Sequence, residues 1–238
     1  MEFQEILKKG LENWGIQAGE EEIFAFCTYK NSLIENNKVM NLTAIEEENE
    51  IAVKHFLDSA SCLLTGKFSV GVRVIDVGTG AGFPSLPLKI LRGDLRLTLM
   101  DSLRKRIRFL EEVGETLALK EILYLHSRAE DAARNKAHRE SYDIAVARAV
   151  APLPILLEYC LPFVRVGGYC LCQKGPAASE ELAASEKALR LLGAKVEDVL
   201  DVSLPFGELT RKILIIQKQK PTPKVYPRKA GAPSKNPL

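Results

Sequence analysis

The sequence has few of the residues that crosslink secreted proteins or bind metal ions. Among its 238 residues are five cysteines, three histidines and one tryptophan. Because the cysteines are scattered and odd in number, they exclude a disulfide scaffold and favour a reducing compartment. The cysteines and the isolated histidines show no spacing typical of metal ligands, so we expect no metal site.

Long apolar runs are also missing. The most apolar stretch, residues 150–166, is interrupted by Glu158 and three prolines, which excludes a membrane-spanning helix. The first residues lack the basic segment and apolar core of a signal peptide. No heptad pattern of a coiled coil is evident. We therefore expect a cytoplasmic protein that is a monomer and does not associate with membranes.

Acidic residues are absent from the C-terminal part of the chain. Residues 211–238 contain eight lysines and arginines and no aspartate or glutamate. Residues 1–210 contain 25 basic and 31 acidic residues, a net charge of −6. A basic end on an acidic body favours an anionic partner, most often nucleic acid. The alternative is a solvated end that only improves solubility.

The pattern of apolar residues divides the chain into three regions. Residues 1–66 show the spacing of helices, one of which is predicted to begin at the capping-box pattern Thr43-Ala-Ile-Glu46. Residues 67–220 alternate short β-rich runs with amphipathic segments, which predicts an α/β fold with a doubly wound, mainly parallel sheet. Residues 221–238 contain five prolines, so we expect an extended basic tail. The β-rich runs are 72–77, 95–100, 122–125, 142–146, 168–172 and 213–216.

A glycine-rich segment, Asp76-Val-Gly-Thr-Gly-Ala-Gly-Phe-Pro84, lies at the end of the first β-rich run. Its glycines, Gly78, Gly80 and Gly82, let the backbone turn tightly and bring N–H groups close to a ligand. The spacing differs from the G-x-G-x-x-G fingerprint of dehydrogenases, because the third glycine comes one residue early. Asp76 would repel a pyrophosphate but suits a cationic ligand such as S-adenosylmethionine (SAM). We therefore predict a SAM-binding loop, with an ordinary glycine-rich turn as the alternative.

Further candidate residues lie at the ends of the following β-rich runs. Asp101 comes about 20 residues beyond the loop, where an acidic side chain can bind both ribose hydroxyls. The alternative is that Asp101 or Ser102 caps the next helix. Ala129 and Glu130 follow the third run, where loops flank the adenine in doubly wound methyltransferases. Arg148 follows the fourth run and would face the methyl group and the target, or else pair with a neighbouring carboxylate.

Two motifs of methyl transfer are absent. The sequence has no Asn/Asp-Pro-Pro-aromatic motif, the usual signature of transfer to an exocyclic amine. It also has no Pro-Cys pair at the fourth run, which covalent attack on a base carbon would require. These absences favour an acceptor that is already nucleophilic, such as guanine N7, which has a free lone pair and no proton to remove. Such an enzyme acts mainly by in-line placement.

Seven motifs follow one another along the chain: Asn41–Ile45, His55–Ser59, Asp76–Pro84, Asp101–Arg106, Ala147–Val150, Lys174–Gly175 and Tyr226–Gly231. This ordered set resembles one protein family, the bacterial 16S ribosomal RNA guanine-N7 methyltransferases, also called glucose-inhibited division protein B. The resemblance runs from Asn41 to Leu238, whereas the first 40 residues match in helical character alone.

The resemblance implies a class I SAM-dependent methyltransferase with a Rossmann-like fold and an N-terminal helical cap. It implies methylation of one guanosine N7 in 16S rRNA, either in the naked RNA or in the small ribosomal subunit. Together with the loop, it gives as cofactor-binding residues Asp76, Gly78, Gly80, Gly82, Phe83, Asp101, Ser102, Ala129, Glu130 and Arg148. The candidates for positioning the target base are Arg148, Lys174 and Arg211. The candidates for binding RNA are Arg104, Lys105, Arg106, Arg211, Arg228 and Lys229.

Two other functions stay open. One is a nicotinamide-dependent oxidoreductase, against which the loop spacing and Asp76 both argue. The other is a non-catalytic SAM- and RNA-binding module with a methyltransferase fold. The intact glycine loop together with Asp101 argues against it, because a decayed site should have lost one of them.

Overall fold

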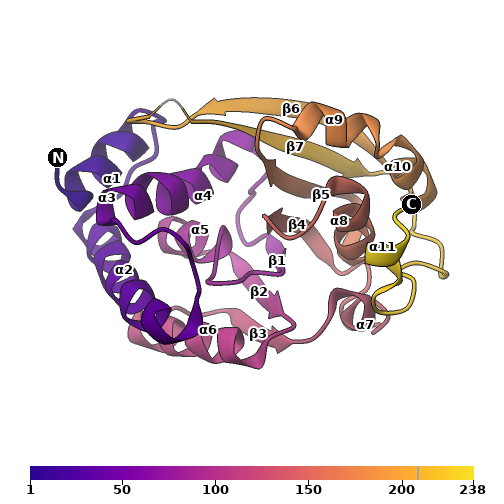
Figure 1. Cartoon of the computed structure of the whole chain (residues 1–238), viewed down its shortest axis with the longest axis horizontal. Coiled ribbons are helices and arrows are strands. Elements are labelled where there is room, and N and C mark those ends of the chain that lie inside the picture. The colour runs from indigo at the N-terminus through magenta and orange to yellow at the C-terminus, as the bar shows by residue number, and fades with distance from the viewer. Residues whose placement is uncertain (208) are drawn as a thin grey trace.

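A mixed β-sheet forms the centre of the molecule (Figure 1). The computed structural model describes residues 1–207 and 209–238. Within them the strands are β1 (Arg73–Val77), β2 (Arg96–Asp101), β3 (Ile122–His126), β4 (Tyr142–Arg148), β5 (Val164–Lys174), β6 (Ala194–Ser203) and β7 (Thr210–Lys218). Their order is β3-β2-β1-β4-β5-β7-β6, with β7 antiparallel to both neighbours and all other pairs parallel. The mainly parallel α/β sheet predicted from the sequence is confirmed.

Helices cover both faces of the sheet, so its central strands are buried on both sides (Figure 1). Successive residues alternate between two apolar cores: Val74 belongs to one and Ile75 to the other, as do Ile215 and Ile216. On the first face lie α1 (Phe3–Glu12), α2 (Glu20–Met40), α3 (Glu48–Ile51), the π-helical η1 (Ala52–Leu57), α4 (Asp58–Ala60), η2 (Ser61–Thr65), α5 (Ser85–Leu91) and α6 (Arg104–Thr116). On the second face lie α7 (Ala129–Ala132), α8 (Leu153–Cys160), η3 (Leu161–Phe163), α9 (Ala178–Ala183) and α10 (Glu186–Leu192), with α11 (Ala232–Lys235) packed on α8.

Strand β6 has no counterpart among the β-rich runs predicted from the sequence. It is an edge strand, and its exposed positions include Lys195, Glu197 and Asp201. Charged side chains on an edge strand prevent pairing with the edge of another chain. The same charges interrupt the apolar pattern, which is why the strand could not be recognised.

Aromatic side chains join the N-terminal helices to the glycine-rich loop. Phe56 of η1 lies between Phe26 and Tyr29 of α2, with ring centroids 5.1 and 5.3 Å away. Tyr29 stacks on Phe83 of the loop at 5.5 Å, and its hydroxyl donates a hydrogen bond to the carbonyl of Ala81. The N-terminal helices therefore hold the loop from the first face of the sheet.

The helix predicted to begin at Thr43 begins later in the structure. Residues 41–47 form an irregular segment, and α3 starts at Glu48. The Thr43 hydroxyl oxygen accepts a hydrogen bond from the Ile45 N–H at 3.0 Å and lies 2.7 Å from His55 Nε2. Because this oxygen is occupied by its own loop and by His55, it does not cap a helix.

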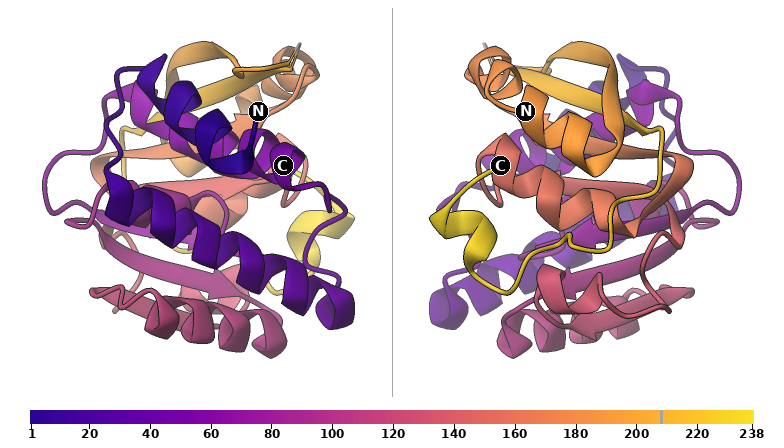
Figure 2. Two further views of the ribbon diagram at one scale, coloured as in Figure 1. Left: turned by 90° about the vertical axis from the view of Figure 1, so that its left-hand side faces the viewer. Right: turned by 90° about the vertical axis from the view of Figure 1, so that its right-hand side faces the viewer.

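The C-terminal tail crosses the second face (Figure 2, right). An ion pair and several hydrogen bonds hold it there. Arg228 binds Glu158 of α8 through its guanidinium, at 2.6 to 3.1 Å, and through its backbone N–H at 2.7 Å. Glu158 is completely buried. Arg139 adds hydrogen bonds to the carbonyls of Thr222 and Tyr226.

The tail differs from its sequence prediction in two respects. It contains a short helix, α11, which tolerates Pro233 because the proline lies in the first turn, where no helical N–H is needed. Arg228, which we expected to contact RNA, has its guanidinium turned toward Glu158 and is 23% exposed. Lys229 is exposed to solvent, as a phosphate contact requires.

We expect Arg228→Met to lower the free energy of unfolding by about 3 kcal/mol, because Glu158 would be left buried without a counter-ion. Urea denaturation followed by circular dichroism measures this change. Lys229→Met is the matched control, because Lys229 is exposed. This substitution should change the free energy of unfolding by less than about 0.5 kcal/mol. Equal stability of the two variants would contradict this account of the tail.

Candidate functional site

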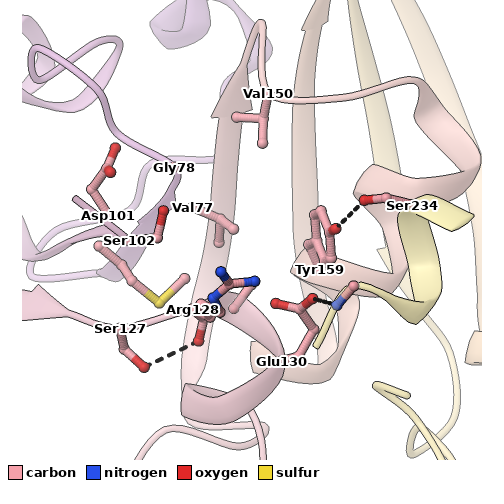
Figure 3. A pocket seen from close by; sticks show the side chains of 13 residues that line it. Val77, Gly78, Asp101, Ser102, Ser127, Arg128, Glu130, Val150, Tyr159 and Ser234 are labelled. Carbon is pink, nitrogen blue, oxygen red and sulfur yellow. Dashed lines mark hydrogen bonds between the residues drawn. The ribbon is translucent and has the colours of Figure 1, made fainter. Parts of the chain in front are cut away.

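The site lies where β1 and β4 run side by side and their connections leave for opposite faces, β1 to α5 and β4 to α8. Such a divergence opens a crevice at the carboxyl ends of the strands. A pocket occupies this crevice (Figure 3). Its lining residues are Val77, Gly78, Met100, Asp101, Ser102, Ser127, Arg128, Ala129, Glu130, Val150, Tyr159, Gly231 and Ser234.

The three glycines of the loop have different surroundings, although all have positive φ angles. Gly78 lines the pocket, and a Cβ there would lie 2.9 Å from a methyl group of Val150 on the opposite side. A Cβ at Gly80 would meet only the Gly78 carbonyl oxygen, at 4.0 Å. Gly82 faces the protein interior, where a Cβ would lie 2.5 Å from the Tyr29 hydroxyl. Gly78 therefore keeps the crevice open, whereas Gly82 allows the loop to approach α2.

Asp76 lies beneath the loop and does not line the pocket. It is 1% exposed, and its Oδ2 accepts hydrogen bonds from the Thr79 hydroxyl at 3.0 Å and the Ser85 N–H at 3.3 Å. Its Oδ1 has no hydrogen-bond partner among the described residues. Burial raises the pKa of Asp76 to about 7. The structure thus gives this carboxyl a role in holding the loop, where we had expected it to face a cationic ligand.

Asp101 lines the pocket, as a ribose contact requires, but it does not cap α6, whose N-cap residue is Leu103. Its Oδ1 accepts a hydrogen bond from the Leu103 N–H at 2.8 Å, just before α6. Its Oδ2 accepts bonds from the Gly80 N–H at 3.1 Å and from Arg106 at 3.3 Å. Asp101 and the adjacent Ser102 also line the pocket. The carboxylate therefore fixes the start of α6 and the glycine loop while it faces the crevice.

The opposite wall of the pocket brings together residues that lie far apart in the sequence. Glu130 accepts a hydrogen bond from the Gly231 N–H at 2.9 Å, and the hydroxyls of Tyr159 and Ser234 lie 2.9 Å apart (Figure 3). Gly231 belongs to a motif noted in the sequence, but its position beside Ala129 and Glu130 depends on how the tail is docked. Tyr159 and Ser234 carry no sequence signal for this site.

A second pocket lies on the other side of the end of β4, since Ala149 lines it and Val150 lines the first. The three predicted positioning residues meet here: Arg148 from β4, Lys174 from β5 and Arg211 from β7. Lys174 Nζ contacts Glu181 at 2.7 Å and the carbonyl of Ala151 at 2.8 Å. The other lining residues are Ile45, Lys54, His55, Asp58, Gln173 and Gly175.

Five of the ten predicted cofactor residues do not line the first pocket: Asp76, Gly80, Gly82, Phe83 and Arg148. Phe83 is buried against Tyr29 and His55. The Arg148 guanidinium lies 4.8 Å above the Phe83 ring and points into the second pocket. Phe83 therefore supports the segment between the two pockets.

The RNA-binding residues predicted on α6 differ in their exposure to solvent. Arg104 and Lys105 are exposed, and Lys105 also reaches the carbonyl of Met40 at 3.1 Å. Arg106 is half-buried against Asp101. The described residues include no group of histidine, cysteine or acidic side chains placed to hold a metal ion. They also include no helix that is long and apolar enough to span a membrane.

We expect Asp76→Asn to stabilise the ligand-free protein at pH 8. The pKa of Asp76 is raised from an ordinary 3.8 to about 7, so its contribution to stability is complete below pH 3.8 and is lost as the pH rises through 7. Asparagine stays neutral, so the free energy of unfolding of the variant should exceed that of the parent protein at pH 8 by on the order of 2–4 kcal/mol. Near pH 4 the two free energies should approach each other.

Urea denaturation at the two pH values measures this difference. Asp143→Asn is the control of opposite sign, because the Asp143 carboxylate accepts a hydrogen bond from Arg165 at 2.7 Å and its neutralisation removes an ion pair. If Asp76→Asn were no more stable than the parent protein at pH 8, the pKa of the buried Asp76 carboxyl could not be raised.

Solved structures resemble this fold at low sequence identity. A SAM-dependent methyltransferase from Aquifex aeolicus matches with a TM-score of 0.54 and 19% identity, covering 74% of this chain and 96% of that one. Fibrillarin from Aeropyrum pernix, solved with natively bound SAM, matches with a TM-score of 0.51 and 20% identity, covering 66% and 73% of the two chains. The Rossmann-like methyltransferase fold predicted from the sequence is confirmed.

Sequence similarity is much higher to one named group of proteins. The ribosomal RNA small subunit methyltransferase G of Alkaliphilus oremlandii is 52% identical over 238 residues, which are 100% of each chain. Residues 22–211 match the GidB family model, described as rRNA small subunit methyltransferase G. The chain therefore belongs to the GidB family of small-subunit rRNA methyltransferases.

Proposed function

We propose that the protein transfers the methyl group of SAM to N7 of a guanosine in 16S rRNA. The observation that carries this proposal is the pair of pockets on the two sides of the end of β4. One contains a glycine loop and a buried acid, and the other gathers three cationic side chains. A methyl donor and a nucleic-acid acceptor need two such compartments with a short path between them. Membership of the GidB family supports rRNA as the acceptor.

The residues of the first pocket fit SAM. Gly78 leaves the crevice open, and Asp101 and Ser102 offer polar groups for the ribose. Ala129 and Glu130 line the position where the adenine belongs in this fold. When bound, SAM supplies an electrophilic methyl group. Asp76, Gly80 and Gly82 serve the site indirectly, through the shape of the loop.

The second pocket suits a target guanosine with its phosphates. Arg148, Lys174 and Arg211 provide positive charge, while Asp58 and Glu181 keep part of that charge compensated. Guanine N7 carries no proton, so these side chains have no proton to remove. Their task is to orient the base in line with the methyl group and to accommodate the positive charge that develops on it.

The outer surface provides contacts to the remainder of the RNA. Arg104 and Lys105 at the start of α6 and Lys229 of the tail are exposed, and each can meet a phosphate. Arg211 faces the second pocket, so we assign it to the target nucleotide. We propose that the protein acts as a monomer in the cytoplasm, on rRNA or on the small ribosomal subunit.

Methyl-labelled SAM tests the reaction directly. The purified protein is offered small ribosomal subunits that lack the modification, the RNA stripped from them, and bulk tRNA. Digestion to nucleosides should give labelled 7-methylguanosine from the ribosomal samples and none from tRNA. Label in another nucleoside would contradict the N7 assignment, and label in tRNA alone would contradict the substrate.

We expect Gly78→Asp to weaken SAM binding by roughly 100-fold or more in isothermal titration calorimetry. The new side chain would collide with Val150 across the pocket and bring a second carboxylate close to Asp101. Gly66→Asp is the matched control, because Gly66 also has a positive φ angle, of 66°, but faces open space away from the pocket. Equal SAM affinity in both variants would contradict the assignment of the first pocket.

A further inference from the structure

The His55–Ser59 motif lies beside the target pocket, where its Asp58 compensates part of the positive charge. It begins in η1, a π-helical turn, and continues into α4. π-Helical turns are rare and frequently occur at functional sites. His55 and Asp58 from this motif both line the second pocket. Their contacts converge on one side chain, Arg148.

His55 is held on three sides. Its ring stacks on Phe83, with centroids 4.6 Å apart. Its Nδ1 lies 3.2 Å from an Arg148 guanidinium nitrogen, and its Nε2 lies 2.7 Å from the Thr43 hydroxyl. A ring restrained by stacking and by both nitrogens has little freedom to rotate.

These contacts determine which nitrogen of His55 carries the proton. Arginine has donors and no acceptor, so Nδ1 must accept from Arg148 and the proton must reside on Nε2. Nε2 then donates to Thr43. Burial, together with the nearby charges of Arg148 and Lys54, lowers the pKa of His55 to about 3, so the ring is neutral at physiological pH. The imidazole therefore acts as a fixed acceptor for the guanidinium.

Asp58 restrains the same guanidinium from a second direction. It is 2% exposed, and its Oδ2 accepts a hydrogen bond from Arg148 at 3.0 Å. Its Oδ1 accepts one from Arg211 at 3.2 Å. The carbonyl of Lys54 takes a further Arg148 hydrogen bond at 3.1 Å. One carboxylate thus separates two arginines that would otherwise repel each other.

We propose that His55 and Asp58 are positioning residues that fix the Arg148 guanidinium, and through it the target base, during methyl transfer. This inference rests on the proposed function. A free arginine side chain samples many rotamers, and ordering it costs conformational entropy. In this chain η1 holds the arginine ordered before RNA arrives. Thr43 extends the same contact network into the irregular segment 41–47.

Steady-state methylation of small ribosomal subunits by His55→Ala and Asp58→Asn tests the proposal. Each variant should lower kcat by about 10- to 100-fold, because the base would be misplaced relative to the methyl group. SAM affinity by calorimetry should stay within about two-fold of the parent protein, since neither residue lines the first pocket.

The chain offers a matched control for each variant. His138 lies 2.7 Å from the Tyr142 hydroxyl and stacks on that ring, but it lies away from both pockets. Asp143 pairs with Arg165 at the opposite end of β4 from Arg148. His138→Ala and Asp143→Asn should cost some stability and leave kcat near the parent value.

A double-mutant cycle with Arg148→Ala separates positioning from a general structural role. If His55 acts through Arg148, His55→Ala should lower kcat by no more than about two-fold once Arg148 is already alanine. Fully additive losses would overturn the proposal, as would unchanged kcat in both single variants. Thermal melts verify that each variant folds. If Asp58→Asn does not fold, the cycle of His55→Ala with Arg148→Ala decides whether the proposal holds.

The outcomes also separate this inference from the proposed function. If the parent protein transfers no methyl group to ribosomal RNA, the proposed function fails. If the parent protein is active and both His55→Ala and Asp58→Asn are equally active, the function stands and the positioning role is wrong.

Discussion

The divergence of the chain after β1 and β4 is the constraint on which the rest of the site depends. These strands are neighbours, but the chain leaves β1 for α5 on one face and β4 for α8 on the other. The two connections cannot fill the space between them, so a crevice results. The glycine loop forms one side of this crevice, and residues 148–150 divide it into two compartments. The position of the site therefore follows from topology, and its chemistry follows from the residues at the strand ends.

Buried acidic side chains bind each of the irregular segments around this crevice through hydrogen bonds or ion pairs. Asp76 binds the glycine loop from below, Asp101 joins it to the start of α6, and Asp58 joins α4 to two strands. Glu158 anchors the tail. Loops lack a regular hydrogen-bond ladder, so an acid that accepts two or three bonds from different segments replaces it. The net negative charge of residues 1–210 thus includes acids that serve the architecture.

Much of this arrangement could be predicted from the sequence, because it depends on local patterns. The alternation of β-rich runs with amphipathic segments predicted the sheet, and the glycine loop at the end of the first run predicted the first pocket. The resemblance to a known family brought Arg148, Lys174 and Arg211 forward, and the structure places them around one cavity. What the sequence predicted well is what neighbouring residues determine.

The remainder depends on contacts between distant segments. Asp76 was expected to face a ligand because its position in the motif does not reveal which side of the strand is covered by the loop. Arg228 was expected to bind RNA because its partner, Glu158, is 70 residues away. Tyr159 lines the pocket and meets Ser234, which is 75 residues away in the sequence. The acceptor role of His55 follows from its partner, Arg148, and not from its own position in the sequence.

The docked tail also has a thermodynamic consequence. Two hydrogen bonds close the pocket wall, between residues 101 and 75 positions apart in the sequence. A pocket completed by such distant partners exists only while the tail is docked. Docking and occupancy of the pocket must therefore favour each other by the same factor, since linkage is reciprocal. A bound ligand would protect residues 221–238 from proteolysis, and any partner that displaces this segment would release the ligand.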